Sequence, residues 1–221
     1  MAAPARRRAV RAWRGWALAW LLAGAAAAPA RAEVWAFEVR LDGRPIGSHR
    51  FELSGPPEAR EVQSVARMDV TLLGVPLYRY RHEARERWRG DCLDGVSART
   101  NDGGEASQVE WPDDTAGASG PVRPACLMSY AYWNPALTRQ TQLLNPQTGQ
   151  LDAVRFERLA DAPLAVNGRE VTAARWRLVA TAPTPAATRQ TLTLWLDRAS
   201  GRWIGLDALV RGDRLLSYRL P

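Results

Sequence analysis

Hydrophobic and polar residues alternate along most of the chain after residue 32. The first such stretch, residues 35–41, has Trp35, Phe37 and Val39 at every second position, with polar or small residues between them. Alternation of this kind is typical of antiparallel strands that bury one face. Turn residues separate the stretches, as in Asp42-Gly43-Arg44-Pro45, so consecutive strands are expected to form hairpins.

Strands are predicted over residues 35–41, 46–53, 61–72, 75–89, 93–101, 106–111, 151–159, 169–180, 188–196, 202–210 and 215–220. In the strand over 75–89 the odd-numbered positions are mostly charged and should face solvent, whereas Tyr78, Tyr80 and His82 form a less polar face. The only helical segment predicted is a short turn within 129–137, capped by Ser129 and interrupted by Pro135. The predicted fold is all-β with a minor helix: a single curved antiparallel sheet of about ten or more strands that forms an open or closed barrel.

The first 32 residues have the three parts of a secretory signal peptide. Arginines at positions 6–14 form a positive segment, residues 16–28 are an uncharged apolar run, and Ala30-Arg31-Ala32 is a small-x-small cleavage site. The apolar run is shorter than the roughly 20 residues that span a bilayer, so cleavage is favoured over a membrane anchor. We expect one mature domain over residues 33–221, periplasmic or secreted from a bacterial cell, with no stable membrane span after cleavage.

Charge is unevenly distributed between these two parts. Six of the 30 basic residues and none of the 23 acidic residues precede Glu33, so the mature part holds 24 basic and 23 acidic residues. A nearly neutral domain lacks the basic surface that binds a phosphate backbone, so no nucleic-acid partner is expected. Every basic residue is arginine, which excludes a lysine Schiff base and a P-loop lysine.

Cys92 and Cys126 are the two cysteines of the chain, and both lie in the predicted mature part. An oxidising compartment joins such a pair by default, and closing this loop would contribute roughly 4 kcal/mol of stability in the chain-entropy model. A metal site or a redox pair fits less well, because the spacing is not C-x-x-C and the chain has only two histidines. A structural disulfide is therefore favoured.

Residues suited to catalysis are few. His49 and His82 are the only histidines, and both lie in predicted strands. The chain has no G-x-S-x-G, no H-E-x-x-H and no phosphate-binding glycine loop. The acidic pairs at 91/94 and 113/114 offer too few oxygen ligands for a calcium loop. We therefore assign no catalytic residue, no metal site and no cofactor.

One stretch departs from the alternating pattern. Residues 126–135 contain Tyr130, Tyr132, Trp133 and Asn134, followed by Pro135. Rings between a disulfide and a turn either line the mouth of a cavity or plug one end of a sheet. On the first interpretation the candidate ligand-binding residues are Tyr130, Tyr132, Trp133 and Asn134.

Three motifs occur in a distinctive order. They are an opening L-D-G-x-x-I-G hairpin (41–47), a Tyr-Trp-Asn-Pro segment followed by Leu-Asn-x-x-Thr-Gly (132–149), and a late Trp-Leu-Asp hairpin (195–197). This order resembles a family of uncharacterised exported proteobacterial proteins, a domain of unknown function, over nearly the whole mature chain. The resemblance implies no activity, because that family has no assigned role. More distantly, the meander is similar to periplasmic lipoprotein carriers, in which a curved sheet forms an open barrel around a hydrophobic ligand.

A large curved sheet must fill its concave side with side chains, a helix or a ligand, and the sequence predicts little helix. We therefore expect a periplasmic binding or carrier module for an apolar small molecule or lipid. An envelope hydrolase would instead bring His49 or His82, an acid and a hydroxyl into one cleft. A structural partner of an envelope complex would show an exposed apolar patch or an unpaired edge strand. The oligomeric state is left open.

Overall fold

The computed structural model describes residues 32–72, 75–112, 126–182, 189–210 and 213–221 of the 221-residue chain. The predicted signal segment, except for Ala32, lies outside the described residues, and so does the acidic pair Asp113-Asp114. The described residues therefore belong, apart from Ala32, to the predicted mature domain.

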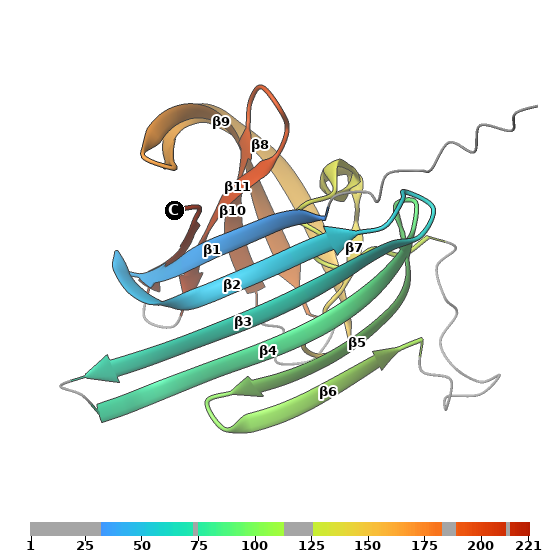
Figure 1. Ribbon diagram of the computed structural model, residues 1–221, viewed down its shortest axis with the longest axis horizontal. Helices are drawn as coiled ribbons and strands as arrows, with labels where there is room; N and C mark the ends of the chain where they lie inside the picture. Colours follow the sequence, from blue (N-terminus) through green and yellow to red (C-terminus); the bar gives the residue numbers. More distant parts are fainter. Residues whose placement is uncertain (1–31, 73–74, 113–125, 183–188, 211–212) are drawn as a thin grey trace, which may run out of the picture.

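The described residues form one antiparallel sheet of twelve strands in the order β6-β5-β4-β3-β2-β1-β12-β11-β10-β9-β8-β7 (Figure 1). Consecutive strands pair with each other except β6 and β7, which are the two edges, and β1 also pairs with β12. The prediction of a single curved antiparallel sheet is confirmed, in its open form. The strands are β1 (Glu33–Leu41), β2 (Arg44–Ser54), β3 (Arg60–Leu72), β4 (Val75–Arg89), β5 (Cys92–Asp102), β6 (Glu105–Trp111), β7 (Gln142–Leu144), β8 (Leu151–Val166), β9 (Arg169–Thr181), β10 (Arg189–Asp197), β11 (Trp203–Val210) and β12 (Arg214–Arg219).

Three hairpins have two-residue turns in which both residues have positive φ, among them Gly103-Gly104 between β5 and β6. Asp42-Gly43 (φ 50° and 80°) joins β1 to β2, and Asn167-Gly168 (φ 51° and 70°) joins β8 to β9. Such turns match the right-handed twist of the strands they connect. β8 therefore reaches Val166, whereas the prediction ended this strand at residue 159. The register shifts between Leu159 and Ala162, and this β-bulge hid the continuation of the strand.

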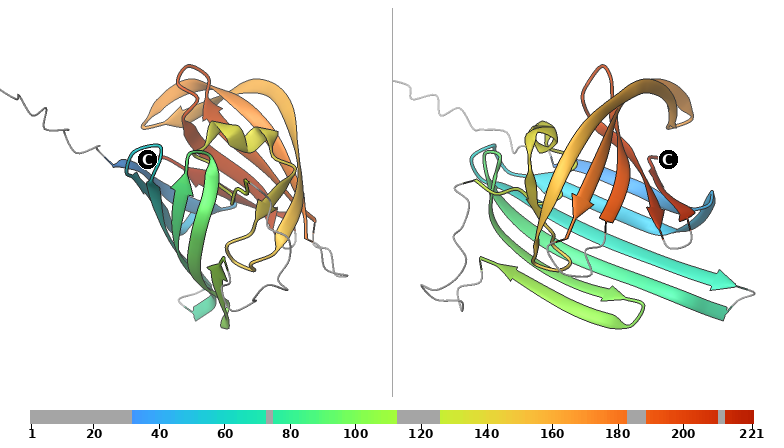
Figure 2. Two further views of the ribbon diagram at one scale, coloured as in Figure 1. Left: turned by 90° about the vertical axis from the view of Figure 1, so that its right-hand side faces the viewer. Right: turned by 180° about the vertical axis from the view of Figure 1, so that it is seen from behind.

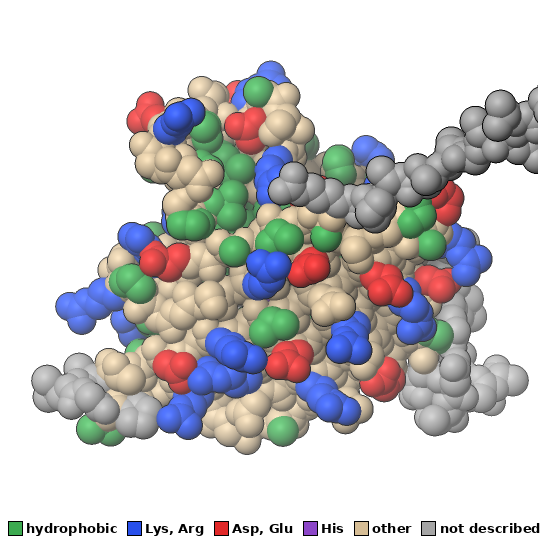
Figure 3. Space-filling view, in the orientation of Figure 1, with side chains coloured by type: hydrophobic (Ala, Val, Ile, Leu, Met, Phe, Trp, Pro, Cys, Tyr) green, Lys and Arg blue, Asp and Glu red, His purple; other side chains and the backbone are tan. Residues whose placement is uncertain are grey.

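The inner face of the sheet is apolar and its outer face is charged. In β4, His82, Ala84 and Trp88 are buried, whereas the intervening Glu83 and Arg85 are exposed. The predicted solvent-facing side of this strand is thus confirmed. Figure 3 shows arginine and acidic side chains scattered over the outer face of β1–β4.

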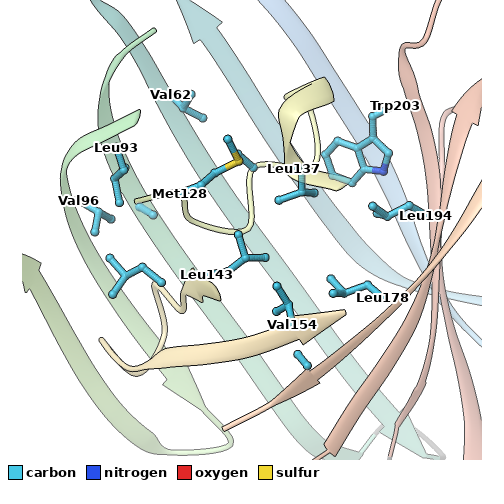
Figure 4. Close-up of a cluster of buried hydrophobic side chains, with 14 of the residues drawn as sticks. Val62, Leu93, Val96, Met128, Leu137, Leu143, Val154, Leu178, Leu194 and Trp203 are labelled. Carbon is cyan, nitrogen blue, oxygen red and sulfur yellow. The ribbon is translucent and has the colours of Figure 1, made fainter. Parts of the chain in front are cut away.

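Residues 126–144, here called the plug, fill one end of the sheet's interior. The views of Figure 2 place this segment between β3–β5 on one side and β8–β10 on the other. In Figure 4, Met128, Leu137 and Leu143 of the plug point toward side chains from both halves of the sheet. These three plug residues are at most 1% exposed. The protein therefore supplies its own core on the concave side, at this end.

The plug is tied to the start of β5. Cys92 and Cys126 form the predicted disulfide, with their Cα atoms 4.9 Å apart. The Leu93 N–H also donates to the Leu127 carbonyl at 2.7 Å. The covalent link and the hydrogen bond fix where the plug enters the sheet.

A 3₁₀ helix, η2 (Pro135–Arg139), lies within the plug. Asn134 is its N-cap, with an extended backbone, and its side chain accepts from the Ala136 N–H. Proline suits the first helical position and keeps the preceding residue extended, so Pro135 begins this helix. The predicted turn capped by Ser129 and interrupted by Pro135 is therefore wrong in its bounds. No helix in the described part of the chain is long and apolar enough to cross a membrane.

The β8–β9 hairpin curls over the outside of the sheet, as Figure 1 shows. Its Leu164 packs with Trp195 of β10 and Ile204 of β11 in a second, smaller hydrophobic cluster. Gly205 makes room for this contact, because a Cβ there would lie 3.1 Å from Leu164 Cδ2. The β8–β9 hairpin therefore covers part of the outer face of β10 and β11.

Candidate functional site

Both histidines and most of the tyrosines gather on the inner face of the sheet. We call His49 (β2), Tyr80 and His82 (β4), Tyr132 (plug) and Tyr218 (β12) the inner cluster. Ring centroids lie 5.6 Å apart for His49 and Tyr218, and 6.3 Å apart for Tyr80 and His82. These residues come from four separate segments of the fold.

Strand register explains why the two histidines approach each other. His49 and His82 both pair with Ala66 of β3, one from each side. Side chains in one row of a sheet share a face, and Ala66 between them is small and fully buried. The two imidazoles therefore occupy the same row of the inner face.

Each histidine contacts a hydroxyl. His49 Nε2 lies 2.7 Å from Ser64 Oγ, and its Nδ1 lies 3.4 Å from the Tyr218 hydroxyl. His82 Nδ1 lies 2.8 Å from Thr100 Oγ1.

Both imidazoles are neutral at neutral pH. Burial, with a smaller effect of neighbouring His82, lowers the pKa of His49 to about 3. Burial also lowers the pKa of His82 to about 4, against a small opposing effect of Glu83. The imidazoles therefore act here as neutral hydrogen-bonding groups.

The tyrosines of the inner cluster are near one another and keep their protons. Burial raises the pKa of Tyr80, Tyr132 and Tyr218 above the usual range, and each of these pKa values is raised further by another tyrosine of the three. All three side chains point inward but are only half-buried. These three residues are therefore less buried than Met128 and Leu143 of the plug.

The four residues predicted to bind a ligand divide into two pairs. Tyr132 belongs to the inner cluster, and Tyr130 is beside it, with ring centroids 6.1 Å apart. Trp133 instead packs against Trp88 at 5.3 Å, near the β4–β5 turn. Asn134 is buried and donates to Asp91 Oδ1 at 3.0 Å. Trp133 and Asn134 thus make contacts that hold the plug in place.

Acidic groups on the inner face form hydrogen bonds with residues other than the two histidines. Asp152 Oδ2 accepts from the Tyr130 hydroxyl at 2.6 Å and from Asn145 Nδ2 at 3.1 Å. Glu86 accepts from Trp88 Nε1 at 3.0 Å, and burial raises the pKa of this carboxyl. Among the described residues, no carboxylate hydrogen-bonds either histidine, so the histidine, acid and hydroxyl expected of a hydrolase are not joined there.

A separate hollow of about 520 Å³ lies on the outer surface, between the β8–β9 hairpin and β1. Figure 3 shows hydrophobic side chains gathered in this region. Its charged groups are already paired: Arg202 bonds Glu33 at 2.9 Å, and Asp197 accepts from Ser200 at 2.7 Å. We therefore place the candidate site at the inner cluster, where the hydroxyls of Tyr80 and Tyr132 have no hydrogen-bond partner among the described residues.

Sequence reasoning missed Tyr218, Ser64 and Thr100 as site residues. Tyr80 and His82 carried a usable signal, because they are two positions apart on the less polar face of one strand. Tyr218 reaches the site only because β12 pairs with β1. Hairpin patterns along the chain do not show that long-range pairing.

Comparison with known proteins gives a family without an assigned role. A family model described as a domain of unknown function, DUF6134, matches residues 37–220. No curated protein matches the chain, and no solved structure matches it. The matched range runs from Phe37 in β1 to Leu220, just after β12, and so takes in the plug and the inner cluster. The chain belongs to the DUF6134 family.

Proposed function

We propose that the protein is an exported binding or carrier module that holds an apolar ligand on the inner face of its sheet, at the inner cluster. The observation that carries this proposal is the difference between the two ends of the interior. Plug residues such as Met128 and Leu143 are at most 1% exposed, whereas inward-facing Tyr132 and Tyr218 keep accessible surface. The proposal places the ligand at the end of the interior whose side chains are less completely buried.

The surroundings of the inner cluster suit an apolar ligand. Phe51, Phe156, Trp176 and Ala208 pack against the main core and are also only half-buried. Aromatic and aliphatic surfaces of this kind, with a few placed polar groups, are the usual lining of small-molecule sites. A ligand covering them would gain about 25 cal/mol for each Å² of apolar surface removed from water.

Export is supported by two features of the chain. The Cys92–Cys126 disulfide suits an oxidising compartment. The first 32 residues have the order of segments found in a secretory signal. A periplasmic carrier would meet its ligand in that compartment.

Native mass spectrometry tests the proposal, on mature protein (residues 33–221) purified from a periplasmic extract without reductant. We expect a co-purifying apolar mass, or binding of a fluorescent apolar probe by the purified protein. Ala208→Trp, on the inner face, should reduce probe binding at least tenfold. Ala36→Trp is the matched control on the exposed outer face and should bind as the unaltered protein does. A bare protein that binds no probe would contradict the proposal.

A second candidate function, docking to an envelope partner, is favoured by one observation. The most exposed large hydrophobic residues are Val75 and Leu77 at the start of β4 and Leu209 at the end of β11, each 59–63% exposed. Charged replacements at Leu77 and Leu209 should abolish such docking and leave probe binding intact. Loss of probe binding alone would assign these residues to ligand entry instead.

A further inference from the structure

Three tyrosine hydroxyls of the inner cluster have at most one hydrogen-bond partner among the described residues. Among the described residues, the hydroxyls of Tyr80 and Tyr132 make no hydrogen bond, and that of Tyr218 has only the 3.4 Å contact with His49. A phenol hydroxyl both donates and accepts, and such groups inside proteins normally find a partner. The three hydroxyls therefore offer hydrogen bonds to a molecule that enters the interior.

The inner cluster has no charged side chain of its own. Its imidazoles and phenols are neutral, and the neighbouring arginines of β4 lie on the opposite face, where Arg81 bonds Asp69 at 2.9 Å. The nearby carboxylate of Asp152 is bonded through Oδ2 by Tyr130 and Asn145, and its buried Oδ1 has no partner among the described residues. An anion brought here would lose its hydration without gaining an opposite charge, and Asp152, which is 4% exposed, is too buried to bond a cation directly, so the site selects against ions.

The strand ends beyond the inner cluster are apolar. Met68 of β3 and Leu216 of β12 pack in one hydrophobic cluster with Tyr80 and Tyr218 on the inner face. Val75 and Leu77 lie at the end of the β3–β4 hairpin, on the side of the sheet away from the plug (Figure 1). An apolar chain leaving the inner cluster in this direction would pass along apolar surface.

Building on the proposed function, we infer that the ligand is an uncharged amphipathic molecule whose head group carries two or more hydroxyl or carbonyl oxygens. The head group hydrogen-bonds to Tyr80, Tyr132 and Tyr218, and the apolar tail runs past Met68 and Leu216 toward the start of β4 at Val75. Glycerol esters and oxygenated rings share this head-group chemistry.

Three probes with the same dodecyl tail length test the inference: 1-monododecanoylglycerol, dodecanoate and dodecyltrimethylammonium. Each is titrated below its micelle-forming concentration into mature, oxidised protein by calorimetry. We expect the neutral glycerol ester to bind at least tenfold more tightly than either ion. A dodecyl glucoside then compares a ring head group with the glycerol head group.

Two sets of variants locate the binding. Tyr80→Phe with Tyr132→Phe removes two hydroxyls that bond no described residue, so the melting temperature should stay unchanged while affinity for the glycerol ester falls about tenfold. Tyr78→Phe is the matched control: it removes an exposed hydroxyl that bonds Asp102 outside the inner cluster, so affinity should stay within about twofold.

The outcomes separate the two proposals. Tighter or equal binding of an ion would overturn the inference and leave the carrier proposal standing. Unchanged affinity in the Tyr80/Tyr132 variant would also overturn the inference, because binding would then not use these hydroxyls. If none of the probes binds, the carrier proposal fails and the inference fails with it.

Discussion

The ring of Tyr132 lies against that of Trp203, with centroids 5.1 Å apart, although Tyr132 belongs to the plug and Trp203 begins β11. Trp203 also contacts Phe37 at 4.4 Å and Phe51 at 5.0 Å. One indole thus connects the plug to β1 and β2. Anything that displaces the plug should therefore move Tyr132 and change the inner cluster.

Removing the disulfide should destabilise the protein by loosening the plug. Cys92→Ser with Cys126→Ser is expected to lower the free energy of unfolding by roughly 4 kcal/mol, as the chain-entropy model gives for this loop. Urea denaturation monitored by tryptophan fluorescence measures the change. Reductant should reproduce the loss in the unaltered protein and have no effect on the double variant. Equal stability with and without the disulfide would contradict the role assigned to it.

Gly47 should not tolerate a side chain. A Cβ there would lie 1.9 Å from the Arg67 carbonyl oxygen and 2.8 Å from Met68 Cα, both backbone atoms of the paired strand β3. Gly47→Ala is therefore expected to lose at least about 2 kcal/mol of stability.

Gly43→Ala provides the comparison for Gly47. Nothing lies within 4 Å of the added Cβ, so this variant bears only the cost of a left-handed backbone, about 1 kcal/mol. Equal losses in thermal unfolding would show that the close approach of β2 and β3 is not the cause.

The sequence predicted the fold better than the site. Strict alternation, as in β1 and β4, indicated strand positions and buried faces because side chains of a strand point alternately to opposite sides. The predicted end of β8 was wrong because a bulge breaks the alternation within that strand. The predicted bounds of the short helix were also wrong, because Pro135 begins this helix and does not interrupt it.

The inner cluster depended on contacts that local patterns do not contain. His49 and His82 are the two histidines of the chain, but their common row depends on two registers with β3. Tyr218 depends on the pairing of the last strand with the first. The aromatic segment at 130–133 stands out in the sequence, but the pattern does not separate Tyr132, which joins the inner cluster, from Trp133, which packs near the β4–β5 turn.

Acidification should destabilise the fold before carboxylates titrate. The pKa values of His49 and His82 are lowered to about 3 and about 4 in the folded protein, from 6.5. At a pH between the folded-state and unfolded-state pKa values of these imidazoles, the unfolded chain binds protons that the folded chain does not. The free energy of unfolding therefore falls as the pH drops below 6.5.

Urea denaturation at about pH 7.5, 6.5 and 5 measures this pH dependence. The raised pKa of Glu86 has the opposite effect on the free energy of unfolding, which it increases as the pH falls. The lowered pKa values of Asp42 and Asp197 affect stability only at lower pH. His49→Gln with His82→Gln should flatten the dependence over this range. An unchanged slope in that variant would rule out the two imidazoles as its source.

Asn134 should matter for stability and not for binding. Asn134→Ala removes the cap on the Ala136 N–H and the bond to Asp91, with an expected loss of about 2 kcal/mol. Thr138→Ala, near the same helix, should change stability little. Calorimetry should give an affinity for the glycerol ester within about twofold of the unaltered protein. A stable variant that no longer binds would instead make Asn134 a ligand-binding residue.

The most direct test of the account is to locate a bound ligand. A monoacylglycerol with a photoreactive diazirine next to its head group is irradiated with the mature protein, and the cross-linked peptides are identified by mass spectrometry. We predict cross-links at peptides that contain Tyr80, Tyr132 or Tyr218, and their loss on Ala208→Trp. Cross-links confined to the outer hollow, at Asn167 or Pro221, would contradict a binding site inside the sheet.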